Sequence, residues 1–148
     1  MLKRLVSFIL ILLFSISFTS CTGLSKWRTY YYTGNLKIEE AYICADVTDN
    51  LEPIKIGNHF TYGIKMVCLW FRYSYSDSNV ALLKVRWYYQ GYFIYQKNYY
   101  LKDKEGVRAF YLFLSSGNPL PRGNYEVRMM YKGKVIKTLK FSIDGGES

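Results

Sequence analysis

Residues 80–101 read VALLKVRWYYQGYFIYQKNYYL and contain two strand-length segments separated by a short turn signal. The first segment, 80–89, alternates between an apolar and a polar set: Leu83, Val85 and Trp87 against Lys84, Arg86 and Tyr88. A period of two is typical of a β-strand with one buried side. Gln90-Gly91 predicts a tight two-residue turn, after which residues 92–101 return as the second strand of a hairpin.

Similar runs recur along the chain, at 37–47, 60–75, 107–114, 124–131 and 134–143. Loops with Gly, Pro, Asn or Ser separate them, the longest at 48–58 and 115–123, and no helical periodicity is found. About seven strands with turns every ~8–12 residues predict an all-β, immunoglobulin-like antiparallel sandwich. Trp87 is the expected core tryptophan, and Tyr125 has the position of a tyrosine corner. The run 60–75 is apolar on both parities, which indicates either two covered faces or a bulge.

The N-terminus has the pattern of an export signal. Lys3 and Arg4 precede an apolar run at 5–18, which is shorter than the ~20 residues of a membrane span but suits a signal peptide. The sequence Phe18-Thr19-Ser20-Cys21 resembles the lipobox of bacterial lipoproteins, although Phe18 stands where Leu is usual. That resemblance implies cleavage before Cys21 and lipid on this residue. Thr22 in place of Asp favours the outer membrane or cell surface.

These segments define the predicted domain organisation: a signal peptide at 1–20, a lipidated tether at 21–35, a sandwich at 36–143 and a polar tail at 144–148. The tether contains Lys26-Trp27-Arg28 and Tyr30-Tyr31-Tyr32. It suits either a membrane interface or a first strand packed on the domain. In the exported domain, Cys44 and Cys68 predict either a disulfide or two buried thiols, and the sequence leaves both open.

The composition is basic and aromatic, with a formal charge of +9 and 16 tyrosines. Export argues against nucleic acid as the partner and favours anionic lipid, an acidic glycan or an acidic protein surface. No catalytic motif is present. The single imidazole, His59, has no partner that the sequence identifies, and Glu39 and Glu40 are adjacent, so on a strand they would face opposite sides. The sequence therefore predicts no enzyme, no cofactor and no metal site.

Strand parity predicts a surface for binding. If Trp87 points inward, its polar neighbours point outward, and the same argument turns Glu126, Arg128, Met130 and Lys140 outward on the two last strands. The returning strand is expected to add Phe93, Tyr95 and Lys97. The predicted binding face therefore consists of Lys84, Arg86, Tyr88, Tyr95, Arg128 and Lys140. The alternative is that these side chains only keep the sheet soluble.

A second resemblance covers most of the domain. Its residues are Ile43-Cys44, Pro53, Phe60, Val85-x-Trp87, Pro121-x-Gly123-x-Tyr125-x-Val127 and Phe141-x-Ile143. They resemble a set of small bacterial sandwich domains, many carried by lipoproteins, that form families of unknown function. The resemblance implies the fold and brings no catalytic residues. We therefore expect a non-enzymatic, membrane-anchored envelope lipoprotein that binds a protein partner. The alternatives are a carbohydrate or peptidoglycan binder and a protease inhibitor that presents loop 115–123.

Overall fold

The computed structural model describes residues 35–77 and 79–145, and the regular structure in these ranges is β-strand throughout. The strands are β1 (Leu36–Val47), β2 (Pro53–Ile56), β3 (His59–Thr61), β4 (Met66–Tyr75), β5 (Ala81–Tyr89), β6 (Tyr92–Leu101), β7 (Glu105–Phe113), β8 (Gly123–Tyr131) and β9 (Lys134–Asp144). Within these ranges no helix is long and apolar enough to cross a membrane. The predicted signal peptide 1–20, the lipidation of Cys21, the tether up to residue 34 and tail residues 146–148 lie outside the described residues.

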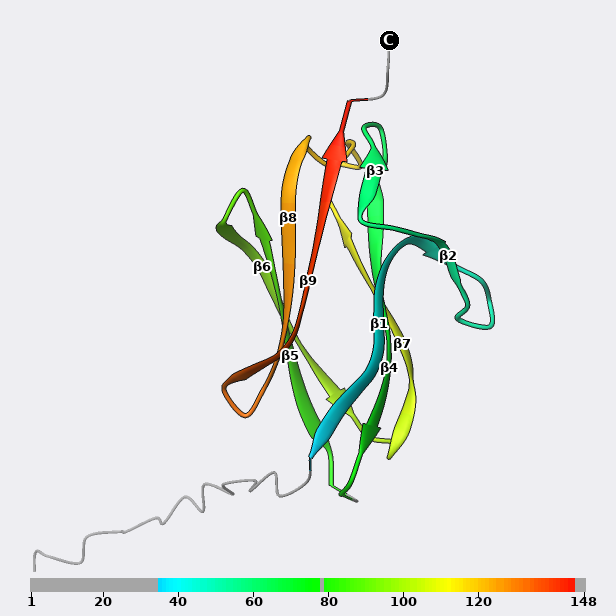
Figure 1. Cartoon of the computed structure of the whole chain (residues 1–148), viewed down its shortest axis with the longest axis vertical. Helices are drawn as coiled ribbons and strands as arrows, with labels where there is room; N and C mark the ends of the chain where they lie inside the picture. Colours follow the sequence, from blue (N-terminus) through cyan, green and yellow to red (C-terminus); the bar gives the residue numbers. More distant parts are fainter. Residues whose placement is uncertain (1–34, 78, 146–148) are drawn as a thin grey trace, which may run out of the picture. The chain divides into compact units, whose positions relative to one another are not determined.

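The strands form two sheets that pack face to face (Figure 1). One sheet has the order β2-β1-β4-β7 and the other the order β3-β9-β8-β5-β6. All pairings are antiparallel except that of β3 with β9, which is parallel. This arrangement is an immunoglobulin-like sandwich, so the predicted fold class is confirmed.

The structure differs from the predicted strands between residues 48 and 65. The predicted loop 48–58 contains β2, and the predicted strand 60–75 is divided into β3 and β4. Gly63 lies between β3 and β4 with φ at 109°, a conformation that residues with a Cβ rarely adopt, so a single strand cannot run through it. The chain pairs β2 with β1 in one sheet and then pairs β3 with β9 in the other.

The core forms between the facing sides of the two sheets. Trp87 on β5 is only 1% exposed, and its ring meets the edge of Phe141 at 6.3 Å between centroids. Tyr125 on β8 stacks on the other side of this cluster, 4.8 Å from Phe141. The alternation in β5 and β8 is visible in their burial, since every second residue is buried. Trp87 is therefore the core tryptophan that the sequence predicted.

The tyrosine corner is also confirmed. The Tyr125 hydroxyl donates a hydrogen bond of 2.7 Å to the carbonyl oxygen of Pro121, four residues upstream. This bond ties β8 to the loop that precedes it. The same loop is held at Leu120, which is buried and whose amide donates to the Ile64 carbonyl at 2.9 Å.

Both sides of β4 are covered, which settles the ambiguity of its two apolar parities. Leu69 and Phe71 face the core, whereas Cys68 and Trp70 belong to a second, smaller cluster on the outer side. The Trp70 indole donates to the Leu51 carbonyl at 2.6 Å, and the Tyr42 ring stacks on it at 5.5 Å. The loop between β1 and β2 thus closes over this cluster.

Two hairpins end in two-residue turns of the same kind. Gln90 and Gly91 have φ values of 49° and 81°, and Lys132 and Gly133 have 51° and 76°. Positive φ at both positions matches the right-handed twist of the flanking strands. The predicted turn at Gln90-Gly91 is confirmed, and the second turn carries Lys132 to the end of the domain near residue 35.

Candidate functional site

The outer side of the five-stranded sheet collects most of the predicted binding residues. Arg86 on β5 lies directly opposite Arg128 on β8, Tyr88 lies opposite Glu126, and Glu126 lies opposite Lys140 on β9. Lys84 lies opposite Met130 in the same row. Their neighbours along β5 and β8 are buried, so these side chains face away from the core. The prediction that the three strands share one sheet, with these residues on its outer side, is confirmed.

The prediction for β6 was partly wrong. A bulge between Trp87 and Tyr88 places Phe93 opposite Tyr88 but Tyr95 opposite Trp87 and Lys97 opposite Val85. Directly opposite residues share one side of a sheet, so Tyr95 and Lys97 lie on the inward side, at its open edge. The expectation that they join the outer face therefore fails. Gln96 takes that place, and its side-chain oxygen accepts a 2.8 Å bond from Arg86 Nε.

We call Lys84, Arg86, Tyr88, Arg128 and Lys140 the basic face. Glu126 lies within it and accepts a hydrogen bond from Arg128 Nε, while Lys140 Nζ lies 3.8 Å from its other oxygen. The hydrogen bond to Glu126 raises the pKa of Arg128, so its guanidinium stays charged. The guanidinium also lies over the Tyr88 ring, 4.4 Å from the centroid. Among the described residues, no carboxylate pairs with Lys84 or Arg86.

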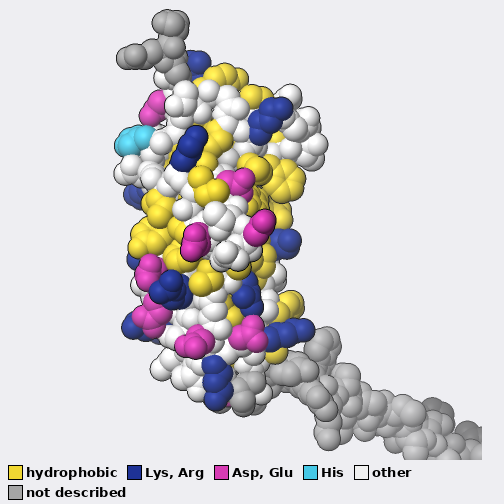
Figure 2. Space-filling view, turned by 90° about the vertical axis from the view of Figure 1, so that its right-hand side faces the viewer, with side chains coloured by type: hydrophobic (Ala, Val, Ile, Leu, Met, Phe, Trp, Pro, Cys, Tyr) yellow, Lys and Arg dark blue, Asp and Glu magenta, His cyan; other side chains and the backbone are white. Residues whose placement is uncertain are grey.

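The four-stranded sheet presents a different outer surface. Figure 2 shows this side, where acidic and basic side chains are interspersed around hydrophobic ones. Glu40 pairs with Arg72, and Glu39 pairs with Lys37. Charges on that side are largely compensated in place, whereas on the basic face Glu126 pairs with Arg128 and Lys140, and Lys84 and Arg86 have no paired carboxylate among the described residues.

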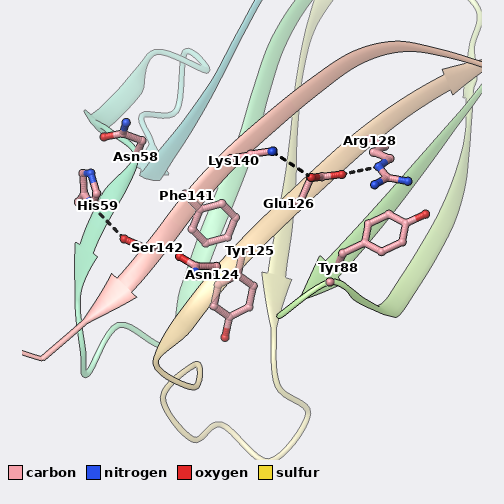
Figure 3. Close-up of a pocket in the computed structure, with 11 residues that line it drawn as sticks. Asn58, His59, Tyr88, Asn124, Tyr125, Glu126, Arg128, Lys140, Phe141 and Ser142 are labelled. Carbon is pink, nitrogen blue, oxygen red and sulfur yellow. Dashed lines mark hydrogen bonds and ion pairs between the residues drawn. The ribbon is translucent and has the colours of Figure 1, made fainter.

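A hollow of about 460 Å³ lies over one end of the basic face. Figure 3 shows its lining, in which Arg128, Glu126 and Lys140 form one wall and Tyr88 stands beside them. The remaining lining is polar or aromatic: Asn58, His59, Gly91, Asn124, Tyr125, Phe141 and Ser142. The hollow therefore offers amides, a hydroxyl, cations and aromatic rings together, which suits a polar or acidic ligand.

His59 enters this hollow through the parallel pairing of β3 with β9. Its Nδ1 lies 2.8 Å from Ser142 Oγ, and the Ser142 hydroxyl donates to Asp144 at 2.9 Å. His59 Nδ1 also lies 3.6 Å from Asp144, so one ring nitrogen faces both the hydroxyl and the carboxylate, whereas nucleophilic catalysis uses the two different nitrogens of an imidazole placed between them. The imidazole and the Asp144 carboxylate are also mostly exposed. Sequence reasoning missed this group, because no local pattern predicts that β3 pairs with β9.

Cys44 and Cys68 occupy directly opposite positions on β1 and β4 and are fully buried. They are two thiols in the structure, and Cys44 Sγ donates to the Cys68 carbonyl at 3.6 Å. The hydrogen bond to Cys44 and the burial raise the pKa of the Cys68 thiol, which keeps it protonated. Elsewhere in the ranges 35–77 and 79–145, no group of three His, Cys, Asp or Glu side chains is arranged to hold a metal ion.

Comparison with protein-family models and with curated proteins gave no match. Among solved structures, an immunoglobulin-like protein from Pseudomonas aeruginosa has a TM-score of 0.50 at 9% identity, covering 74% of this chain and 97% of that one. An alkylpurine DNA glycosylase from Pseudomonas fluorescens has 0.47 at 10% identity over 74% of this chain and 30% of that one. A CARDB domain from Pyrococcus furiosus has 0.42 at 16% identity, covering 78% and 97%. At these identities the first similarity supports the fold alone, and the lower scores add nothing to it.

Proposed function

We propose that this protein is a non-enzymatic lipoprotein of the bacterial cell envelope, anchored by lipid on Cys21, that binds an acidic segment of another envelope protein through the basic face. The anchor rests on the resemblance of residues 18–21 to a lipobox. The outer membrane or cell surface is the favoured location, because Thr22 follows the cysteine.

The observation that carries the binding proposal is the position of Arg86 opposite Arg128. Like charges directly opposite each other destabilise a pair of strands, by up to about 1 kcal/mol. The core under this face does not need either guanidinium, since both point away from it. A carboxylate-rich partner would relieve the repulsion, and paired arginines bind carboxylates in a bidentate manner.

The aromatic residues of the face support a protein contact. Tyr88 is held by Arg128 on one side and by Phe93 on the other, whose ring centroid lies 6.0 Å away. Tyrosine and arginine side chains that are already positioned are typical of the residues that dominate binding energy at interfaces. The hollow beside them extends the contact surface toward Asn124 and Ser142.

The test is crosslinking in intact cells followed by affinity capture. An Arg86→Glu/Arg128→Glu variant reverses the charge of the face, and Lys55→Glu/Lys65→Glu makes the same charge change on exposed residues elsewhere. We expect one discrete protein to be captured by the wild type and the control, and to be lost with the Arg86/Arg128 variant. If the charge-reversed variant has an unchanged circular dichroism spectrum and still captures the partner, the basic face is not the binding surface.

The anchor is tested separately by fractionation. Cys21→Ala removes the sulfur that would carry the lipid and should shift the protein from the membrane to the soluble fraction. A protein that stays in the membrane after this substitution is not held by lipid on Cys21.

A glycan is the second candidate ligand, favoured by the polar lining of the hollow. Asn58 and Asn124 place amides there, and Tyr88 provides a ring on which a sugar could stack. Sedimentation with insoluble cell wall separates the two candidates. Binding to wall that is lost in Tyr88→Ala, with no protein captured in cells, would favour the glycan.

A further inference from the structure

One end of the five-stranded sheet carries a cluster that the basic face does not explain. Its apolar members are Leu82, Tyr100, Met130 and Val135, and its cations are Lys84, Lys132 and Lys134. We call these seven residues the hairpin patch, because the β8–β9 hairpin supplies most of them.

The strand register brings the apolar members of the hairpin patch together on the outer side of the sheet. Leu82 lies opposite Tyr100, and Met130 lies opposite Val135 on its other side. Tyr100 is 64% exposed and Val135 is 49% exposed, because no other part of the described structure covers them. A hollow of about 140 Å³ between Leu82 and Met130 is lined by Lys84 and Lys132 as well.

Lys84 and Lys132 border these apolar groups and line the same hollow, whereas Lys134 lies opposite the buried Tyr131, on the inner side at the tip of the hairpin. Lys84 lies opposite Met130, and the turn at Lys132-Gly133 continues into Lys134. None of the seven residues is acidic. The acidic side chains that form ion pairs at this end belong to other elements. Asp103, in the loop between β6 and β7, pairs with Arg108, and Glu39 on β1 pairs with Lys37. Asp77 lies in the turn between β4 and β5.

The hairpin patch lies at the end of the domain where the tether enters. Asn35, the first described residue, exchanges hydrogen bonds with Ser76, and Leu36 lies opposite Tyr75. The Tyr75 hydroxyl in turn accepts a 3.5 Å bond from Tyr131, next to Lys132. Residues 22–34 separate Asn35 from Cys21, so Asn35 cannot lie more than about 50 Å from a lipid on that cysteine.

We propose that the hairpin patch docks on a membrane surface that contains anionic phospholipid. This proposal rests on the proposed anchor at Cys21, which brings the patch within reach of the bilayer. Lysine ammonium groups bind lipid phosphates, tyrosine favours the interface, and short apolar side chains insert among the headgroups. A protein partner would not require this composition to lie at the tethered end.

The experiment uses the lipidated protein in vesicles, with a fluorophore on Asn98→Cys. Asn98 is exposed and lies opposite Lys84, at the margin of the hairpin patch. Cys44 and Cys68 are fully buried and do not compete for the dye. Nitroxide-labelled lipid quenches the dye when the patch touches the bilayer. Ile56→Cys, exposed on the four-stranded sheet, reports the opposite side of the domain.

The matched variants each remove two positive charges. Lys132→Gln/Lys134→Gln alters the hairpin patch, and Lys55→Gln/Lys65→Gln is the control. The turn tolerates Gln at position 132, because Gln90 precedes Gly91 with the same positive φ in the other hairpin. Since each lysine near an anionic surface contributes about 1 kcal/mol, the patch variant should dock roughly 30-fold more weakly.

In vesicles with phosphatidylglycerol, we expect the dye to be quenched at position 98 and not at position 56. This quenching should be lost in 0.5 M salt and in the patch variant, and it should remain in the control variant. Quenching that is absent while the protein stays membrane-bound overturns the docking and leaves the anchor intact. Equal quenching in phosphatidylcholine alone, or quenching that follows protein density instead of anionic lipid, also overturns it. If the protein proves not to be held by lipid on Cys21, the docking is tested without the anchor. A Cys21→Ala protein labelled at position 98 is mixed with excess vesicles, and quenching of its dye shows whether the hairpin patch binds the bilayer.

Discussion

The two buried tyrosines Tyr125 and Tyr73 make a matched pair for testing what the tyrosine corner contributes. Both are almost fully buried, at 3% and 1% exposure, and Phe removes one oxygen from each. The Tyr125 hydroxyl donates to Pro121, whereas the Tyr73 hydroxyl is a buried polar atom without a hydrogen-bond partner among the described residues. The two substitutions therefore differ in one interaction.

Tyr125→Phe loses a hydrogen bond and leaves the Pro121 carbonyl without its donor. A neutral hydrogen bond contributes about 1 kcal/mol, and an unsatisfied buried partner adds ~1–3 kcal/mol. Because the loop around Pro121 is exposed, water can reach part of this carbonyl, and we expect a loss of about 1–2 kcal/mol in the free energy of unfolding. Tyr73→Phe removes a hydroxyl that is desolvated without compensation, so it should be neutral or slightly stabilising.

Urea unfolding followed by circular dichroism measures both variants. In a thermal scan, a loss of about 1–2 kcal/mol corresponds to a fall in Tm of roughly 4–9 °C for a domain of about 110 residues. Equal losses in the two variants would refute the reasoning, because they would show that the removed oxygen matters by its volume and not by its hydrogen bond. An unchanged Tyr125→Phe would show that the corner contributes nothing measurable.

Two further outcomes follow from the buried thiols and tyrosines. The structure holds Cys44 and Cys68 as two thiols, but their directly opposite positions place the Cα atoms about 4.5–5.5 Å apart, a separation that a disulfide spans. Oxidation after export should link them, so peptide mapping of the exported protein without reductant should recover Cys44 joined to Cys68, and recovery of Cys44 as a free thiol contradicts this. Burial raises the pKa of Tyr99, Tyr111 and Tyr125 to about 12, above the ordinary value of 10.0. Unfolded tyrosines then lose their protons first, so the free energy of unfolding should hold below pH 10 and fall between pH 10 and 12. Urea midpoints that stay constant up to pH 12 would rule out this linkage.

Local patterns were enough to predict the hairpins and the core anchors. Trp87 could be placed because its neighbours alternate, and Tyr125 because Pro121-x-Gly123 precedes it. Both features depend on residues within a few positions of each other. The outward direction of Arg86 and Arg128 followed from the same alternation, so the centre of the basic face was predictable as well.

Features that depend on distant pairing were not predictable. The bulge that turns Tyr95 inward depends on how β6 fits against β5, and Ile94 is the extra residue that the alternation cannot reveal. His59 meets Ser142 only because β3 joins β9 in parallel. In the same way, the apolar outer side of β4 is explained by Leu51, a loop residue that no periodicity connects with Trp70.

The hairpin patch and the hollow lie at opposite ends of one sheet, and this separation constrains how both proposals fit together. Leu82 and Tyr88 are six residues apart on β5, about 20 Å along an extended strand. A domain docked through the hairpin patch would therefore hold Tyr88 and the larger hollow up to about 20 Å from Leu82, where an acidic partner can approach, whereas Arg128 lies two residues from Met130, about 7 Å along β8. Only Lys84 belongs to both surfaces. The two sites should then act independently: charge reversal at Arg86 and Arg128 should abolish partner capture without changing quenching at position 98, and Lys132→Gln/Lys134→Gln should do the reverse. Loss of both readouts from either pair would mean that one surface serves both contacts.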